Sequence, residues 1–286
     1  MGVKIVTDST AYLTKELRDK YDISIASLNV IFGNESKRES DMTNKEFYER
    51  IERENVIPTS SQPSTQELLD LFTNIIKKGH KVLAIFITSK MSGTFQAAHL
   101  VKNMVKEDYP DADIEILESN SNCMELGFAA LEAAKAALDG KNFKEVISHA
   151  KDIINKGKFV FAPATLKYLE KGGRIGKASA LLGSVLKIIP ILTVQEGQVI
   201  VANKVRTSKK AINTIIDTFL KDIDKYGLGG AVVHHINCEE EAKKIANALK
   251  IKTGKDILIG SIGPVIGVHV GPGAVGIAYF TQEKIE

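Results

Sequence analysis

Apolar, β-rich runs alternate with segments of helical periodicity along the first half of the chain. The clearest strand is VLAIFIT at 82–88, and similar runs lie at 3–7, 23–32 and 114–118. The pattern between them predicts helices, two of which open with a capping box, over residues 14–21, 43–54, 64–78, 94–106, 124–138 and 143–156. This alternation is typical of βαβ units and predicts a mostly parallel sheet.

The second half continues the alternation and adds a hairpin. Strands at 189–195 and 198–205 meet at Glu196-Gly197, a pair typical of a tight turn. The other predicted elements are helices at 208–225 and 239–251, short helical segments flanking 172–176, and strands at 159–163, 231–236, 257–262 and 277–282. We therefore expect an α/β fold with two α/β domains, 1–157 and 158–286. The first has a mostly parallel sheet and the second a mixed sheet, and the C-terminal strand is compatible with either domain.

Composition places the chain among soluble globular proteins. It has 286 residues, of which 44% are hydrophobic and 26% charged, and its net charge of +3 is too small to indicate a nucleic-acid partner. The two cysteines, Cys123 and Cys238, lie in different segments and fit a reducing compartment. No signal-peptide pattern opens the chain, and Lys187 and Pro190 interrupt its longest apolar stretch. We therefore expect a cytoplasmic protein that does not span a membrane, although transient contact with a membrane surface is compatible with the sequence.

The stretch GPVIGVHVGPGAVG at 263–276 holds His269 among five glycines and two prolines. Gly271, Gly273 and Gly276 match the dinucleotide pattern G-x-G-x-x-G. That pattern requires a preceding strand, a following helix and an acidic residue about 20 positions later. The chain ends ten residues after Gly276, and IAYFTQ resembles a strand. We reject the nucleotide interpretation and predict a tight glycine frame that presents His269.

Two hydroxyl-rich loops are candidates for an anion site. PTSSQPS at 58–64 precedes a capped helix, and TSKMSGT at 88–94 lies between a strand and a helix. Ligands of open α/β sheets bind at the carboxyl ends of strands, and helix N-termini attract anions. Ordinary capped loops would show the same residues, so spacing alone leaves both interpretations open.

Two further segments match known motifs only in part. KGGRIGKAS at 171–179 is one residue too short for a phosphate loop, which leaves Arg174 on a glycine turn as a candidate for a carboxylate or phosphate contact. A surface cation is the alternative. HHINCEE at 234–240 contains possible metal ligands, but adjacent histidines on a strand point to opposite faces. We therefore predict no metal site and no cofactor.

Six segments in order resemble the DegV family of fatty-acid-binding proteins. They are TDST at 7–10, PTSSQPS, SGTFQ at 92–96, TLKYLEKGGRIGK, KVRT at 204–207 and IGPVIGVHVGPGAVG. The resemblance covers nearly the whole chain. It implies two α/β domains that hold one long-chain fatty acid between them, such as palmitate, stearate or oleate. It also implies a lipid-binding protein of phospholipid metabolism, not an enzyme itself, that presents the acid's carboxylate to a separate fatty acid kinase subunit.

The resemblance assigns the ligand-binding residues by motif. Carboxylate contacts are expected from the hydroxyls of Ser60 or Ser61 and of Ser92. The backbone N–H groups of Gly93 and Thr94 are expected to support them. Arg174 and His269 match positions near the carboxylate, and we expect them to matter more for transfer than for holding the ligand.

Two segments depart from the family pattern. Serine stands at Ser60 where the family often has threonine, and Glu118-Ser119 stands where it usually has an Asp-Ser pair.

We expect the Ala- and Leu-rich stretches at 124–138 and 180–192 to line the tunnel or to pack in the core. A stand-alone lipid carrier or sensor is the alternative function, ahead of a phosphotransferase acting alone.

Overall fold

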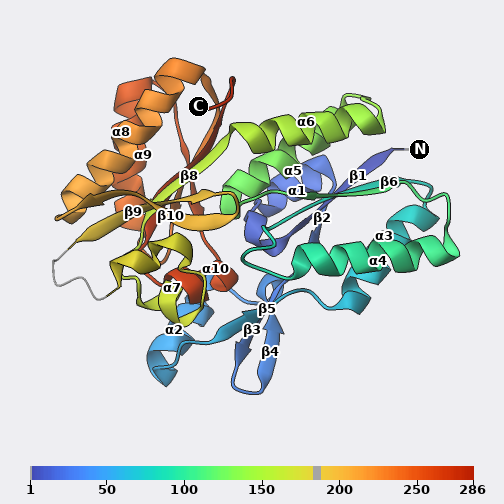
Figure 1. Ribbon diagram of the computed structural model, residues 1–286, viewed down its shortest axis with the longest axis horizontal. Helices are drawn as coiled ribbons and strands as arrows, with labels where there is room; N and C mark the ends of the chain where they lie inside the picture. The colour runs from blue at the N-terminus through green and yellow to red at the C-terminus, as the bar shows by residue number, and fades with distance from the viewer. Residues whose placement is uncertain (1, 183–187) are drawn as a thin grey trace.

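The first half of the molecule is built on a parallel sheet with helices on both faces (Figure 1). The computed structural model describes residues 2–182 and 188–286. The strand order is β2-β1-β6-β7, with β1 at Val3–Asp8, β2 at Ile23–Ala26, β6 at Lys81–Phe86 and β7 at Ile114–Glu118. The helices are α1 (Lys15–Tyr21), α3 (Thr65–Lys77), α4 (Thr94–Asp108), α5 (Cys123–Leu138) and α6 (Phe143–Lys156). The predicted parallel sheet is confirmed.

Alternating side chains of β6 enter two different cores. Val82, Ala84 and Phe86 pack with α3 and α4 on one face of the sheet. Leu83 and Ile85 point to the other face, where α5 lies. This separation follows from the two-residue period of a strand, which is why an uninterrupted apolar run marks a strand buried on both sides.

The second half contains a mixed six-stranded sheet in the order β10-β9-β8-β13-β11-β12. Its strands are β8 (Gly157–Ala162), β9 (Ile189–Gln195), β10 (Gln198–Val205), β11 (Leu228–His235), β12 (Leu258–Ser261) and β13 (Val275–Thr281). Helices α8 (Ser208–Tyr226) and α9 (Glu239–Thr253) cover one face, and α5 from the first half packs against β8 and β13. The predicted hairpin and mixed sheet are confirmed, and the C-terminal strand joins this second sheet.

A small third sheet corrects one predicted strand. The run at 23–32 is two strands, because β2 pairs with β1 while β3 (Asn29–Phe32) turns away to join another sheet. That sheet has the order β4-β3-β5, with β4 at Glu35–Arg38 and β5 at Thr59–Ser61, and α2 (Asn44–Glu54) lies between its last two strands in the sequence. Apolar periodicity continues through residues 23–32 and does not mark where the pairing partner changes.

The glycine-rich stretch is also different from the predicted frame. Residues Pro264–Val270 form a short helix, α10, which packs beside α7 (Lys167–Lys171). Its first N–H groups have distant partners: Val265 N donates to a Glu39 carboxyl oxygen at 2.8 Å, and Ile266 N donates to the Tyr12 hydroxyl at 3.2 Å. These tertiary bonds satisfy a helix start for which the local sequence has no capping side chain. The helix ends at Gly271, whose φ is +82°.

One hydrophobic cluster continues from the first half of the chain into the second. It joins Ile5 and Leu83 to Phe159, Phe161 and Phe280. The predicted boundary at 157/158 falls at the start of β8, and the two-domain division stays a prediction. None of the helices in the described ranges is both long enough and apolar enough to cross a bilayer.

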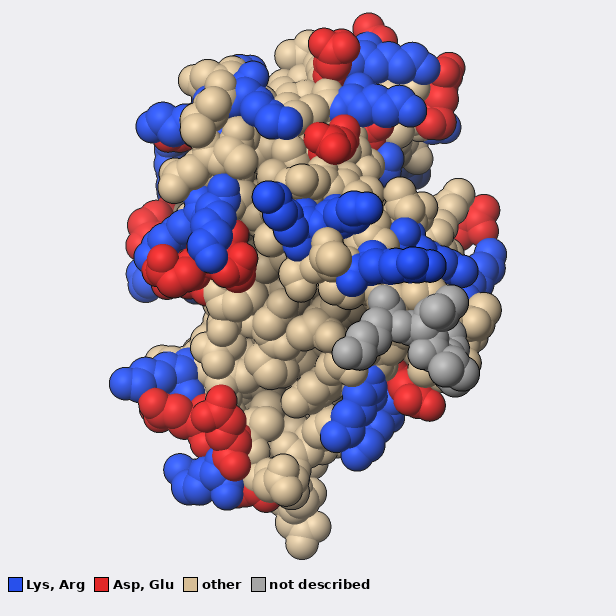
Figure 2. Space-filling model, turned by 90° about the vertical axis from the view of Figure 1, so that its left-hand side faces the viewer, with Lys and Arg blue, Asp and Glu red and all other residues tan. Residues whose placement is uncertain are grey.

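Basic side chains are unevenly distributed over the surface. Figure 2 shows the face at the left of Figure 1, where Lys and Arg side chains gather across the middle and an area without charged side chains lies below them. Exposed Lys204 lies on β10, exposed Arg206 follows that strand, and exposed Lys209 and Lys210 lie in the first turn of α8. A net charge of +3 therefore conceals a local concentration of positive charge.

Candidate functional site

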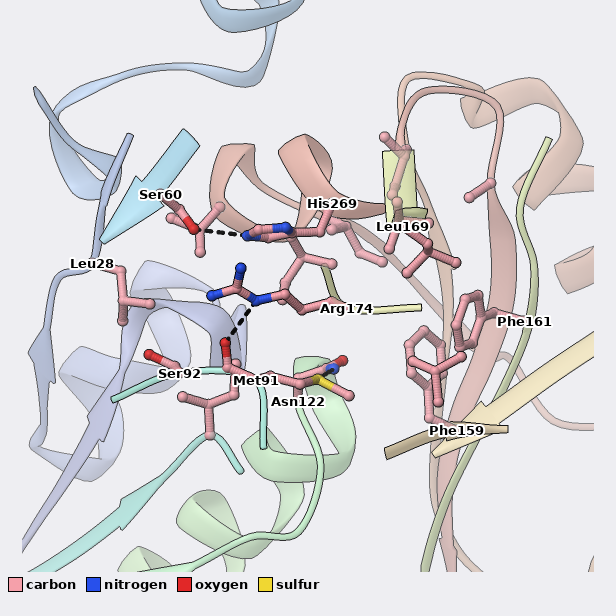
Figure 3. Close-up of a pocket in the computed structure, with 18 of the residues that line it drawn as sticks. Leu28, Ser60, Met91, Ser92, Asn122, Phe159, Phe161, Leu169, Arg174 and His269 are labelled. Carbon is pink, nitrogen blue, oxygen red and sulfur yellow. Dashed lines mark hydrogen bonds between the residues drawn. The ribbon is translucent and has the colours of Figure 1, made fainter. Parts of the chain in front are cut away.

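A cavity of about 280 Å³ lies between the two larger sheets, and both halves of the chain line it. This volume lies just below the range of roughly 300–1,000 Å³ that is typical of small-molecule sites. Its polar lining comes from Ser60, Ser61, Gln62, Ser92, Gly93, Asn122, Arg174 and His269. Its apolar lining includes Leu28, Ile87, Met91, Phe159, Phe161, Leu169, Val199, Ile236, Ile262, Val265, Ile266 and Val270. In Figure 3 the serines, Arg174 and His269 lie at one end and the two phenylalanines at the other.

Ser60 and His269 are 209 positions apart in the sequence and are hydrogen-bonded in the structure. Ser60 lies on β5 and His269 on α10, and 2.8 Å separates the serine Oγ from His269 Nε2 (Figure 3). Burial, together with the nearby charge of Arg174, lowers the pKa of His269 to about 4. The imidazole is therefore neutral at pH 7, and its Nδ1 has no hydrogen-bond partner among the described residues. If Nε2 carries the proton and donates to Ser60, the serine O–H is free to donate to a ligand.

Arg174 is held at the same end of the cavity by two backbone carbonyls. Its Nε donates to Met91 O at 3.1 Å and its Nη1 to Gly172 O at 2.6 Å. Within the described ranges these carbonyls are the only hydrogen-bond acceptors of the guanidinium, and it forms no ion pair with an acidic side chain. A half-buried guanidinium with spare N–H groups beside serine hydroxyls is suited to an anion, above all a carboxylate.

Gly172 allows the imidazole to approach the turn that carries Arg174. A Cβ at this position would lie 2.2 Å from His269 Nδ1, although its φ of −76° is ordinary for any residue. Glycine is therefore needed here for space and not for backbone conformation.

Ser92 lines the cavity, whereas Thr94 lies behind it. The Ser92 and Thr94 hydroxyls are 2.8 Å apart, and Thr94 N donates to Ser92 Oγ at 3.3 Å. Thr94 is fully buried at the start of α4 and is not among the residues that line the cavity. The Thr94 N–H thus bonds to Ser92 and does not face the cavity in this structure, and its expected support of a ligand stays a prediction. Gly93 is exposed at the cavity rim, close to the Gln62 side chain.

Glu118 organises the loop that leads to Ser92. Its carboxylate accepts hydrogen bonds from Ser89 N at 2.6 Å and from the Thr88 hydroxyl at 3.0 Å. Burial acts to raise its pKa, but these bonds outweigh burial and leave the pKa below its usual value. Ser119 bonds to the carbonyl of Ser121. The Glu118-Ser119 pair therefore shapes two adjacent loops and does not line the cavity.

The lining residues differ from those expected for the tunnel. No described residue of 124–138 or 180–192 lines the cavity, and positions 183–187 lie outside the described residues. The α5 stretch packs in the core instead. Sequence analysis missed Asn122, Phe159 and Phe161. Alternation along β8 directs Phe159 and Phe161 to the same face, so that pattern was a usable signal, whereas nothing in the sequence singled out Asn122.

The two adjacent histidines of β11 have different surroundings. His234 is buried, with Nε2 accepting from Met124 N at 3.2 Å and Nδ1 2.9 Å from Gly260 O. His235 Nδ1 accepts from Cys238 N at 3.4 Å. In the part of the chain that the structure describes, no three His, Cys, Asp or Glu side chains are grouped as a metal site.

Comparison with known proteins identifies the family. A family model described as "Uncharacterised protein, DegV family" matches residues 2–282. The chain belongs to the DegV family. A DegV domain-containing protein of Clostridium acetobutylicum is 51% identical to it over 285 residues, which is 100% of each chain. The family resemblance noted from the six sequence segments is confirmed.

Solved structures of DegV proteins share the fold. The crystal structure of DegV from Bacillus subtilis, a fatty acid binding protein, matches with a TM-score of 0.89 and 36% identity over 98% of this chain and 99% of that one. A stearic-acid-binding protein from Eubacterium ventriosum matches with a TM-score of 0.90 and 27% identity over 98% of both chains. The α/β fold with one parallel and one mixed sheet is therefore a DegV fold.

Proposed function

We propose that this DegV protein binds one long-chain fatty acid in the cavity between its two larger sheets. Relatives of the same fold bind fatty acids, one of them stearic acid. The observation that carries the proposal is the division of the cavity into two ends. The polar end holds a guanidinium that has no acidic partner among residues 2–182 and 188–286, and the apolar end holds Phe159 and Phe161. A carboxylate with a hydrocarbon tail has the same division.

The tail supplies most of the binding free energy in this proposal. Burying about 15 methylenes at ~0.8 kcal/mol each offers on the order of 12 kcal/mol before association costs. Burial of the carboxylate is unfavourable, since a buried charge without partners costs several kcal/mol. Ser60, Ser92 and Arg174 would offset that cost with hydroxyl and guanidinium donors. In the tautomer that carries its proton on Nε2, His269 would orient Ser60 by donating to its Oγ.

We further propose that the protein presents the carboxylate to a separate kinase subunit. Gln62 and Gly93 at the polar end are exposed, and Ser60, Ser92 and Arg174 are half-buried. Apolar lining residues such as Phe161, Leu169 and Val265 are buried. A second protein would thus reach the head group while the tail stays covered. The sequence lacks a complete nucleotide motif, so the phosphate donor would be bound by the partner.

Native mass spectrometry of the purified protein tests the binding proposal. We expect an added mass that matches a long-chain fatty acid. Ser92→Ala should retain less of this ligand, because it removes a hydroxyl at the polar end. Ser36→Ala, the same change on the exposed strand β4, serves as the control and should retain the wild-type amount. An empty wild-type protein that also fails to bind added palmitate would reject fatty acid binding.

Acyl-phosphate formation tests the kinase proposal. Protein loaded with radiolabelled palmitate is incubated with ATP, with and without a purified bacterial fatty acid kinase subunit. We expect acyl phosphate only when the kinase is present, and less of it with Arg174→Ala or His269→Ala. Loaded protein that stays unreactive with the kinase supports a lipid carrier or sensor, and product formed by the protein alone supports a phosphotransferase.

A further inference from the structure

Thr88 is fully buried just after β6, and its carbonyl and hydroxyl groups both hold the loop that follows. The carbonyl oxygen accepts from Met91 N at 3.1 Å and from Ser92 N at 3.2 Å. The hydroxyl donates to a Glu118 carboxyl oxygen at 3.0 Å and accepts from Lys90 N at 3.2 Å. One residue therefore fixes the path of this loop and ties it to the end of β7.

The same loop supplies the contact that orients Arg174. Arg174 Nε donates to Met91 O at 3.1 Å, close to Ser92 in Figure 3. The other acceptor of the guanidinium, Gly172 O, lies two positions away in its own turn. In the part of the chain that the structure describes, Met91 O is thus the one hydrogen-bond partner that fixes the guanidinium relative to Ser92. A shift of the loop would change how the arginine faces the cavity.

The tip of the hairpin between β9 and β10 packs against the Thr88 hydroxyl. Gly197 lies in this tip, and a Cβ there would overlap Thr88 Oγ1. Its φ of +77° also favours glycine. The absence of a side chain leaves the hydroxyl in place for its bonds to Glu118 and Lys90. Segments from both halves of the chain therefore meet at Thr88.

We propose that Thr88 is a positioning residue of the anion site. It holds the Met91 carbonyl where that group orients Arg174, and the oriented guanidinium makes the cavity prefer a carboxylate to an uncharged head group. Thr88 is not among the residues that line the cavity, so it acts through Arg174 and does not touch the ligand. The inference rests on the proposed fatty acid binding.

The test uses two variants of Thr88 and two ligands. Thr88→Val keeps the shape of the side chain and removes both bonds of the hydroxyl, whereas Thr88→Ser keeps the hydroxyl. Isothermal titration of delipidated protein should show stearate binding about tenfold weaker in Thr88→Val, with octadecanol binding changed less than about twofold. Thr88→Ser should restore stearate binding to near the wild-type affinity.

A matched control separates positioning from a general loss of stability. Thr281 is equally buried, and its hydroxyl donates to Lys156 O and Glu283 O on β13, away from the cavity. Thr281→Val should lose stability and keep both affinities. A second comparison approaches Thr88 from the hairpin. Gly197→Ala should weaken stearate binding as Thr88→Val does, whereas Gly140→Ala, with a φ of +81° and no atom within 4 Å of its added Cβ, should not.

A double variant tests whether Thr88 acts through Arg174. Adding Thr88→Val to Arg174→Met should weaken stearate binding little further, because the group that Thr88 positions is already gone. Unchanged stearate affinity in Thr88→Val, equal losses for stearate and octadecanol, or additive losses in the double variant would each overturn the proposal. If Thr88→Val does not fold, the comparison of Gly197→Ala with Gly140→Ala decides. Wild-type protein that binds no stearate would instead reject the proposed function.

Discussion

Replacing Gly172 with alanine tests whether the contact between the Arg174 turn and His269 shapes the anion site. The added Cβ would lie 2.2 Å from His269 Nδ1, whereas ordinary contacts begin at 3.4 Å. The imidazole or the turn must therefore move by about 1.2 Å, the difference between those two distances. Either movement disturbs a hydrogen bond of the site, between His269 and Ser60 or from Arg174 to Gly172 O.

The size of the effect follows from how the clash is relieved. In the ligand-free protein the imidazole can move into the cavity, but a bound fatty acid requires it to return. The strain then reappears in the complex and lowers affinity. Overpacking of this kind typically costs about 1–3 kcal/mol, which corresponds to roughly 5- to 150-fold weaker binding.

Isothermal titration of delipidated protein with palmitate measures the change. Gly173→Ala in the same turn is the matched control, because its Cβ would meet nothing within 4 Å while its φ of +66° is unfavourable for alanine. We expect this control to lose about 1 kcal/mol of stability and to keep its palmitate affinity. Gly172→Ala should instead lose palmitate affinity and keep most of its stability.

A double variant distinguishes the clash from a general loss of folding. His269→Ala removes the imidazole, so adding Gly172→Ala to it should weaken binding little further, and the two costs should not add. Wild-type affinity in Gly172→Ala, or strictly additive costs in the double variant, would refute the close-contact argument.

Three further experiments address charge and protonation. Arg174→Met should weaken stearate binding at least about tenfold, as loss of a charge-assisted hydrogen bond predicts, and leave octadecanol binding unchanged; equal losses for both ligands would point to packing instead of charge. The pKa of His269, about 4 in the free protein, should rise when palmitate binds, because an anionic head group favours the imidazolium. If NMR titration gives the same pKa with and without palmitate, the carboxylate does not lie beside His269. Burial raises the pKa of Glu39 from 4.5 to about 7, so its contribution to stability is complete below pH 4.5 and is lost as the pH rises through 7. The free energy of unfolding of Glu39→Gln relative to wild type should therefore rise by on the order of 3 kcal/mol between pH 4.5 and pH 8. Urea unfolding measures this difference, and an equal difference between the two proteins at both pH values would show that Glu39 does not titrate in this range.

Local pattern was sufficient to predict most helices and strands of this protein. The run at 82–88 has apolar side chains on both faces because its strand is buried between two helical layers, and that burial is visible in the sequence. Capping boxes at Thr43 and Ser64 marked the starts of α2 and α3, since a cap depends on residues three positions apart. The hydroxyl loops and Arg174 were likewise recognisable from residue type and position.

Tertiary structure decided the elements whose hydrogen-bond partners are distant. Strand β5 exists because Thr59, Ser60 and Ser61 pair with β3, and α10 begins where Glu39 and Tyr12 accept its free N–H groups. Those partners lie about 30 to 250 positions away, beyond the reach of periodicity or spacing. The contact between Ser60 and His269 depends on both elements. The sequence by itself therefore singled out most of the polar residues that line the cavity, whereas only the folded chain decided which of them meet.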